Sequence, residues 1–282
     1  NDILKKITTI DENRFSLNTI ELPTTIKNRL RKNSKKKSSY ASNKIEGNPL
    51  TEKQVSDVID SDPHKHFLKP EQEVRNYFLA LNLLEEKLKY KEPFSKKMIL
   101  EVQAMVEKGA SKEKIGLRGS MPPGVLFAVY DSETGIPEYI PPEYIDIPDL
   151  LDELIEYVNT TDDHPLIIAG VVHYQLVTIH PFEDGNGRTA RLWQNVILSN
   201  WESLFEYVPI ESEIKKYQEE YYKAIQNCNL SGESTEFVEF MLKMINEVLN
   251  SNYVSVLVKF PLNTFNTSMC PFHIAVLSSL LK

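Results

Sequence analysis

Cysteine is scarce in this sequence, and that scarcity excludes two kinds of architecture. Two cysteines, Cys228 and Cys270, occur in 282 residues, 42 positions apart and without a C-x-x-C pair. This spacing argues against a cysteine zinc site and a disulfide framework, and it suits a reducing compartment. A chain of this length buries roughly three quarters of its extended surface, so it can hold a core without disulfides.

Long apolar runs are also missing. The longest nearly apolar stretch, residues 166–179, is interrupted by His173 and Gln175 and falls short of the roughly 20 residues that span a bilayer. Residues 1–10 include acids and lack the apolar core of a secretory signal. We therefore expect a cytoplasmic protein with no membrane partner.

Glycine is limited to 10 residues, and apolar side chains recur at the 3.6-residue spacing of helices. The hydrophobic and charged shares, 41% and 26%, are those of a soluble globular protein and exclude intrinsic disorder. Thr51 with Gln54 matches a capping box, Pro70 suits a first helical turn, and Gly109 suits a left-handed cap. The sequence predicts a mainly α protein, with helices from about 51 and at 70–90, 95–109, 148–159, 165–179, 186–199, 211–226 and 233–249.

One segment, residues 124–142, lacks the helical pattern. Residues 125–130 form a β-rich run, residues 132–135 provide turn chemistry, and residues 136–140 can return as a second strand before two prolines. Two strands alone are marginal in water, so this hairpin has to pack on the helices. In a helical protein such a hairpin often covers a site.

Charge is unevenly distributed along the chain. The net charge is -8, so the molecule as a whole repels nucleic acid and anionic lipid. Residues 27–37 nevertheless contain seven basic residues and no acidic ones. A short basic run on an acidic protein favours a solvated helix face, and a nucleic-acid or anionic-ligand site is the competing interpretation.

The segment 180–191 reads HPFEDGNGRTAR and lies between an apolar helix and the next predicted helix. Gly185, Asn186 and Gly187 allow successive backbone N–H groups to point the same way, which makes an anion-binding nest. The nest begins a helix, whose unpaired N–H groups and dipole add positive potential at that end. The segment therefore predicts an anion site.

Two arginines, an acid and a histidine accompany the predicted nest. Arg188 and Arg191 lie three residues apart, on one helix face, and their two charges favour a polyphosphate over a single carboxylate. One carboxylate beside a phosphate site is the usual protein ligand of Mg2+, so Asp184 is the candidate metal ligand. His180 has an ordinary pKa close to neutrality, which makes it the candidate general base.

Other residues of interest are interpreted as structural. Phe182, between a proline and two acids, is best explained as an inward anchor of the loop. His173 shares a helical face with His180, and without an H-E-x-x-H motif this favours packing or a supporting hydrogen bond over metal ligation. The same structural interpretation is given to His64, His66, His164 and His273.

Taken together, the twelve residues resemble the signature of the Fic (Fido) family, H-x-F-x-[DE]-G-N-G-R-x-x-R, and match it at every specified position. The resemblance includes YIPP at 139–142 and SNKIEGN at 42–48, and it spans about 38–199. It implies a Fic-type helical bundle with a small β-hairpin flap. Tyr139 and Ile140 of that flap would align a target segment by strand addition.

The resemblance also implies a division of the chain into three parts. Residues 1–91 would be an N-terminal helical region with an inhibitory motif, 92–204 the catalytic core, and 205–282 a C-terminal helical extension. After Tyr253 the hydrophobic pattern is too irregular to predict an element.

Most proteins with this signature are adenylyltransferases, which move AMP from ATP to a Ser, Thr or Tyr hydroxyl of a target protein. By resemblance, His180 would take the proton of that hydroxyl, Asp184 would hold Mg2+, and the nest with Arg188 would bind the phosphates. Positioning and charge stabilisation carry most of the catalysis in such a reaction. Some related enzymes transfer other phosphate-containing groups, so the donor stays open.

A second motif, Ser42-x-x-x-Glu46-Gly47, resembles the inhibitory pattern [ST]-x-x-x-E-[GN] of one Fic class. The resemblance implies that Glu46 pairs with Arg191, the arginine meant for the γ-phosphate, so that ATP binds only in a non-productive pose. Each 1.4 kcal/mol that favours such a closed state lowers the competent fraction about tenfold. We therefore expect low basal activity.

Two alternatives remain beside AMP transfer. The same site could remove AMP from modified proteins, because a glutamate at the γ-phosphate position can also position a water. A nucleotide-sensing regulator could bind nucleic acid through residues 27–37, although the acidic balance disfavours nucleic acid as a partner. A homodimer is left open as the assembly.

Overall fold

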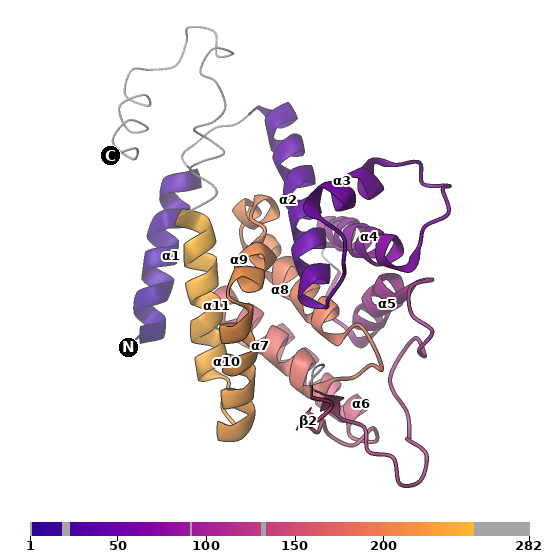
Figure 1. Ribbon diagram of the computed structural model, residues 1–282. Helices are drawn as coiled ribbons and strands as arrows, with labels where there is room; N and C mark the ends of the chain where they lie inside the picture. The colour runs from indigo at the N-terminus through magenta and orange to yellow at the C-terminus, as the bar shows by residue number, and fades with distance from the viewer. Residues whose placement is uncertain (1, 19–22, 91, 131–133, 251–282) are drawn as a thin grey trace, which may run out of the picture.

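Two helices packed against each other, α7 and α8, form the centre of the fold (Figure 1). The computed structural model describes residues 2–18, 23–90, 92–130 and 134–250. In it α7 (Pro165–Ile179) lies between two hydrophobic clusters, with Ala169 in one and Val172 in the other. The helix is therefore apolar on nearly all sides, as a buried helix must be.

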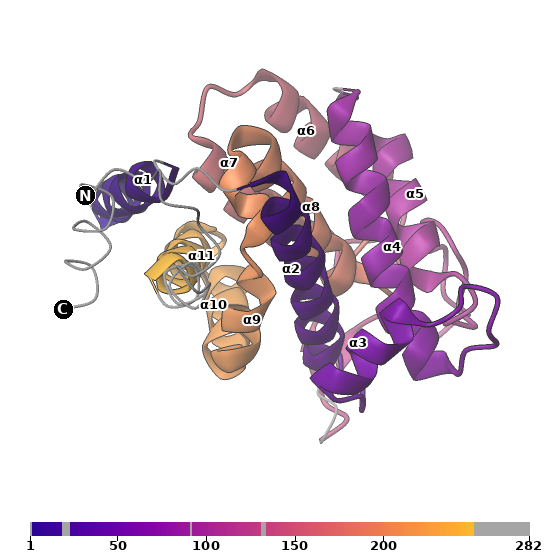
Figure 2. The ribbon, with the colours of Figure 1, turned by 90° about the horizontal axis from the view of Figure 1, so that it is seen from above.

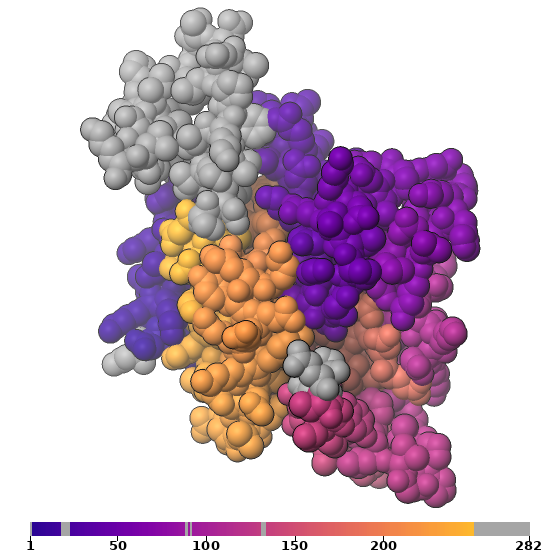
Figure 3. Space-filling view, viewed as in Figure 1, coloured from indigo at the N-terminus to yellow at the C-terminus, as the bar shows by residue number. Residues whose placement is uncertain are grey.

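The remaining helices lie on two sides of this centre, with α2 running between them (Figure 2). One cluster joins α1, α9, α10 and α11, and the other joins α4, α5 and α6, while α7 and α8 contribute to both. On the face in Figure 3 the purple N-terminal helices border the orange helices, and the contact between them includes α2 against α9. The bounds are α1 Asp2–Asn18, α2 Thr24–Ile45, α3 Glu52–Asp60, α4 Lys69–Lys89, α5 Lys96–Glu107, α6 Ile147–Thr160, α8 Asn186–Trp201, η1 Ser203–Tyr207, α9 Ile210–Lys216, α10 Gln218–Ser231 and α11 Thr235–Val248.

The mainly helical fold class is confirmed, and local signals located most of the helices. The capping box of Thr51 and Gln54 is present at the start of α3, and Ser95 caps α5 by accepting from Met98 N. Gly109 has the left-handed conformation expected of it, with φ of 68°. These ends were predictable because caps satisfy the free N–H and C=O groups of the nearest turn.

One segment predicted as a single helix forms two helices instead. Residues 211–226 were expected as a single helix, but the chain bends at Tyr217 and divides into α9 and α10. The bend lets α9 pack against α2, while α10 turns to pack against α11. Tyr217 has φ of −109° and ψ of 39°, outside the helical range. Packing against two different neighbours therefore overrides a continuous helical pattern.

The hairpin is present but shorter than predicted. Antiparallel strands β1 (Val129–Tyr130) and β2 (Pro137–Tyr139) pair Val129 with Tyr139, with an irregular register next to it. Val125 and Leu126, expected in the first strand, are about half exposed and lie outside it. A proline at the start of β2 removes one ladder donor, which limits the pairing.

No helix among the described residues is both long and apolar enough to cross a bilayer. The cytoplasmic location and the division at 91/92 and 204/205 stay predictions. The irregular segment after Tyr253 lies outside the described residues.

Candidate active site

The loop between α7 and α8 is a fixed turn. His180 ends α7 in a left-handed conformation, with φ of 49°, and it is the one described non-glycine residue with positive φ. Phe182 is fully buried, as predicted. The Asn186 side chain donates to Phe182 O at 2.9 Å and accepts from Phe182 N at 3.0 Å. Asn186 therefore closes the loop from within instead of facing a ligand.

The His180 imidazole is held so that one nitrogen can accept a proton. Nδ1 lies 3.2 Å from Val177 O, which fits an N–H at that position and leaves Nε2 as the acceptor. Burial lowers the pKa of His180 to about 4, with a further lowering from Arg118 and a partial offset by the Val177 carbonyl. The ring is therefore neutral at pH 7, the state that a general base requires.

A Cβ at either glycine of the predicted nest would meet a carboxylate. Gly185 has φ of 85°, and a Cβ there would collide with Glu107 Oε1. At Gly187 a Cβ would lie 2.5 Å from Glu46 Oε1 and 3.1 Å from Arg191 Nη1. Two carboxylates thus approach the nest from opposite helices, and each stands against one glycine.

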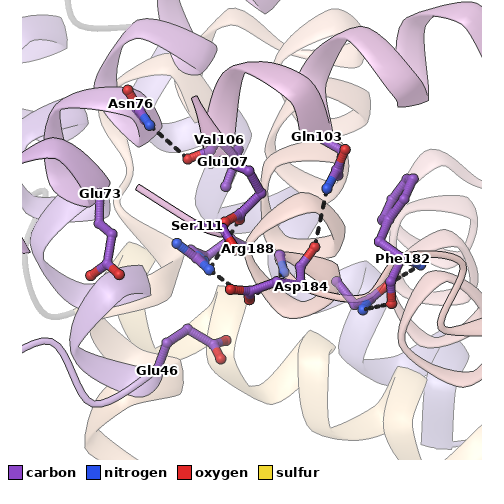
Figure 4. Close-up of polar contacts among 12 residues, drawn as sticks. Glu46, Glu73, Asn76, Gln103, Val106, Glu107, Ser111, Phe182, Asp184 and Arg188 are labelled. Carbon is purple, nitrogen blue, oxygen red and sulfur yellow. Dashed lines mark hydrogen bonds and ion pairs between the residues drawn. The ribbon is translucent and has the colours of Figure 1, made fainter. Parts of the chain in front are cut away.

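Arg188 is buried and shared by two acids (Figure 4). Its Nη2 donates to Asp184 Oδ1 at 2.9 Å and lies 3.0 Å from Glu107 Oε1. The Arg188 side chain is 6% exposed, that of Glu107 2% and that of Asp184 39%. The arginine therefore has one solvent-facing acid partner and one enclosed partner.

The Asp184 carboxylate fits the part of a single protein ligand for Mg2+. Among the described residues its hydrogen bonds use Oδ1 alone, from Gly185 N at 2.6 Å and from Arg188. The described chain contains no group of three or more His, Cys, Asp or Glu side chains that could hold a metal. A magnesium ion would thus take its other ligands from phosphate oxygens and water.

The contact expected between Glu46 and Arg191 is present. Arg191 Nη2 lies 2.5 Å from Glu46 Oε1, and the guanidinium also donates to Ser42 Oγ at 2.8 Å and to Ser42 O at 3.1 Å. Partial burial raises the pKa of Glu46, but Arg191 and Arg188 outweigh this effect and hold that pKa below its ordinary value. Glu46 is therefore ionised at neutral pH, while its inhibitory role stays a prediction.

The flap residues lie beside the loop but differ in exposure. The Tyr139 hydroxyl donates to Thr178 O at 2.9 Å, two residues before His180, which fastens β2 to the end of α7. Burial raises the pKa of Tyr139 to about 12. Ile140 is 57% exposed. Ile140 could therefore meet an incoming segment, whereas Tyr139 is already engaged.

Three residues near the loop were not predicted: Gln103, Glu107 and Arg118. Gln103 Nε2 donates to Asp184 O at 3.3 Å. Arg118 donates from Nε to His180 O at 2.8 Å and from its backbone N to Pro181 O at 2.9 Å. Burial raises the pKa of Glu107 to about 7 although Arg188 opposes it. No local motif marks these residues, because their roles depend on contacts with a distant segment.

The basic tract at 27–37 lies on α2 and is largely paired with acids of the chain itself. Arg31 and Lys35 both contact Glu85, and Arg31 also pairs with Glu206. Lys32 and Lys36 pair with Asp60. These pairs compete with phosphate contacts, which weakens the nucleic-acid alternative.

Comparison with known proteins shows which family the chain resembles. A model of the Fic/DOC family matches residues 93–198. The chain is 26% identical over 258 residues to the protein adenylyltransferase Fic of Drosophila mojavensis, covering 87% of this chain and 47% of that one. It is 38% identical over 107 residues to the protein adenylyltransferase fic-1 of Caenorhabditis elegans, covering 38% and 19%. The chain thus spans half or less of these curated relatives.

Solved structures resemble the fold over most of the chain. A Fic family protein from Desulfovibrio desulfuricans G20 superposes with a TM-score of 0.75 at 28% identity, covering 91% of this chain and 74% of that one. Fic-1 from C. elegans gives a TM-score of 0.72 at 25% identity, covering 91% and 73%.

Proposed function

The chain is a member of the Fic family, and on that premise we propose that it acts as a protein adenylyltransferase, moving AMP from ATP to a hydroxyl of a target protein. The observation that carries the proposal is the neutral His180 imidazole at the edge of a glycine nest with two buried arginines. A base beside a polyphosphate site is what transfer to an alcohol requires.

In the proposed reaction His180 Nε2 takes the proton of the target hydroxyl. The hydroxyl oxygen forms a bond to the α-phosphorus, the bond from that phosphorus to the bridging oxygen of the β-phosphate breaks, and pyrophosphate leaves. Bound phosphates place negative charge near the ring and raise the pKa of His180 from about 4, which makes it a stronger base.

The phosphate chain would be held by the Gly185–Gly187 amides and by Arg188, at the positive end of α8. Asp184 would bind Mg2+, which neutralises phosphate charge when present. The hairpin beside His180 would align the target segment through Ile140 and the backbone of β2. These groups bring the hydroxyl and the α-phosphate together, so positioning supplies most of the rate.

Glu46 would act as the brake on this reaction. Its carboxylate forms an ion pair with the guanidinium of Arg191, which is the group proposed to bind the γ-phosphate. ATP then has to displace an ionised side chain or bind with its phosphates turned away. We expect the native chain to transfer AMP slowly and Glu46→Gly to raise that rate by tenfold or more, because each 1.4 kcal/mol of relief is a factor of ten.

The test supplies ATP and Mg2+ with cell lysate as the source of acceptor proteins, using label on either the α- or the γ-phosphate. Glu46→Gly should transfer the α-label to protein far faster than the native chain does. Adding His180→Ala to that variant should lower the transfer rate at least a hundredfold. Labelling by the γ-phosphate instead would mean phosphoryl transfer and contradict the proposal. Release of label from protein that already carries AMP, without transfer, would assign the reverse reaction.

A further inference from the structure

Glu107 is a buried acid that the proposed reaction does not use. It is the last residue of α5, and its side chain is 2% exposed. Neither of its carboxylate oxygens takes a hydrogen bond from the described residues, although Oε1 lies 3.0 Å from Arg188 Nη2. An enclosed carboxylate without hydrogen bonds is costly to fold, so a structural role alone is a poor explanation for it.

The backbone around Glu107 is held rigidly. Asn76 Nδ2 donates to Val106 O at 2.8 Å and to Lys108 O at 2.9 Å, on both sides of the acid. Figure 4 shows the Glu107 side chain pointing from this fixed helix end toward Arg188, with Asp184 beyond it. The carboxylate is therefore presented to the arginine from a stationary support.

The two acids on Arg188 have different prospects once a nucleotide binds. Asp184 is 39% exposed and is the candidate ligand of Mg2+, so a bound metal would share its carboxylate with the arginine and weaken their pairing. Glu107 has no such alternative, because it is enclosed and its nearest cation is Arg188. After metal binding, Glu107 would be the acid on Arg188 whose charge is not shared with the metal, and it would contribute most to the direction of the guanidinium.

We propose that Glu107 is the positioning residue of Arg188: it holds the guanidinium toward the Gly-Asn-Gly nest when Asp184 is shared with the metal, and so sets the affinity for the phosphate chain. This inference rests on the proposed nucleotide site. It assigns Glu107 no contact with substrate; the residue acts through Arg188.

The test measures binding of an ATP analogue with a methylene group between its α- and β-phosphates, in the Glu46→Gly background where the nest is open. Glu107→Leu removes the carboxylate, and Glu107→Gln keeps its shape and one acceptor oxygen. Glu101→Gln is the matched control, because it removes an acid from the same helix at the surface. Affinity is measured by calorimetry with Mg2+ and with a chelator.

With Mg2+ we expect Glu107→Leu to weaken binding about tenfold and Glu107→Gln about threefold, because a charged partner orients a guanidinium more strongly than a neutral amide does. With the chelator, Asp184 still holds Arg188, and both losses should shrink below about twofold. Glu101→Gln should match the parent. In AMP transfer the KM for ATP should rise while kcat stays within twofold.

Equal losses with and without Mg2+, or no loss in Glu107→Gln, would overturn the positioning role. If Glu107→Leu does not fold, the Mg2+-dependent loss in the isosteric Glu107→Gln decides the matter. A parent that transfers AMP while the Glu107 variants bind normally refutes only this inference. A parent that neither binds the analogue nor transfers AMP refutes the proposed function, and the inference falls with it.

Discussion

Two carboxylate–arginine pairs flank the same glycine nest, and they differ in the helix that supplies the acid, in the exposure of the acid and in the direction of its pKa shift. Glu46 follows α2 and pairs with Arg191, whereas Glu107 ends α5 and lies against Arg188. The Glu46 side chain is 38% exposed and that of Glu107 2%. Neighbouring arginines hold the pKa of Glu46 below its ordinary value, while burial raises that of Glu107 to about 7.

This difference separates a removable contact from a fixed one. Glu46 can turn into water when its pairing with Arg191 is lost, because part of its side chain is already solvated. Glu107 cannot leave without exposing the packed end of α5. The first environment suits a brake that must be released, and the second suits a support that must persist during turnover.

The largest expected effect is a loss of stability when alanine replaces either glycine of the nest. Gly185→Ala forces a left-handed backbone on alanine and pushes a Cβ into the enclosed Glu107, so we expect a loss of roughly 3 kcal/mol of stability. A Cβ at Gly187 would meet Glu46, which can swing into solvent, and would lie 3.1 Å from Arg191 Nη1, which has to shift by only a few tenths of an ångström; we expect Gly187→Ala to lose less than about 1.5 kcal/mol. Urea unfolding measures both. Gly119→Ala, with no atom closer than 3.9 Å to its Cβ, is the control, and equal losses at 185 and 187 would contradict the distinction.

A smaller effect should appear in the pH dependence of stability. The pKa of Glu107 is raised on folding, so its protonated form favours the folded state and its contribution is lost as pH rises from about 4.5 through 7. At 1.36 kcal/mol per pKa unit, the native chain should lose roughly 2–3 kcal/mol relative to Glu107→Gln between pH 5 and 8.

Chemical unfolding at several pH values measures this difference in stability. The charged groups that also influence the pKa of Glu107 are Arg188, Asp184, Glu73 and Glu46. Glu46→Gly is the comparison variant. Because the pKa of Glu46 is lowered, its contribution is present above pH 4.5 and is lost as the pH falls below that value. A difference between native and Glu107→Gln that is flat from pH 5 to 8 would refute the raised pKa.

The smallest effect is expected far from the nest, on the same helix that leads to Glu46. Arg31→Ala removes the pairing of α2 with Glu206 and Glu85. The three side chains are 21–27% exposed, so the loss should be less than about 1 kcal/mol. AMP transfer by the native chain should stay within twofold. If Arg31→Ala instead raised the rate of AMP transfer as much as Glu46→Gly is expected to, the inhibition would depend on the packing of the whole of α2 and not on Glu46 alone.

Local signals accounted for the parts of the site that lie close together in the chain. The nest, the inward Phe182 and the start of α8 follow from glycine torsions and helix ends within a few residues. The bend at Tyr217 and the short hairpin did not follow, because each depends on what the segment packs against. A motif for Glu46 existed only as a resemblance, and Glu107 had no motif.

The amino-acid sequence alone therefore determined which groups the site contains: an imidazole, a glycine nest, an acid and two arginines, all held by one turn between two helices. The family resemblance had implied the pairing of Glu46 with Arg191, but only the tertiary structure brought Glu107 to Arg188 and decided how much water each carboxylate retains. Pairing and burial arise from helices distant in sequence, and they move the pKa values of Glu46 and Glu107 in opposite directions.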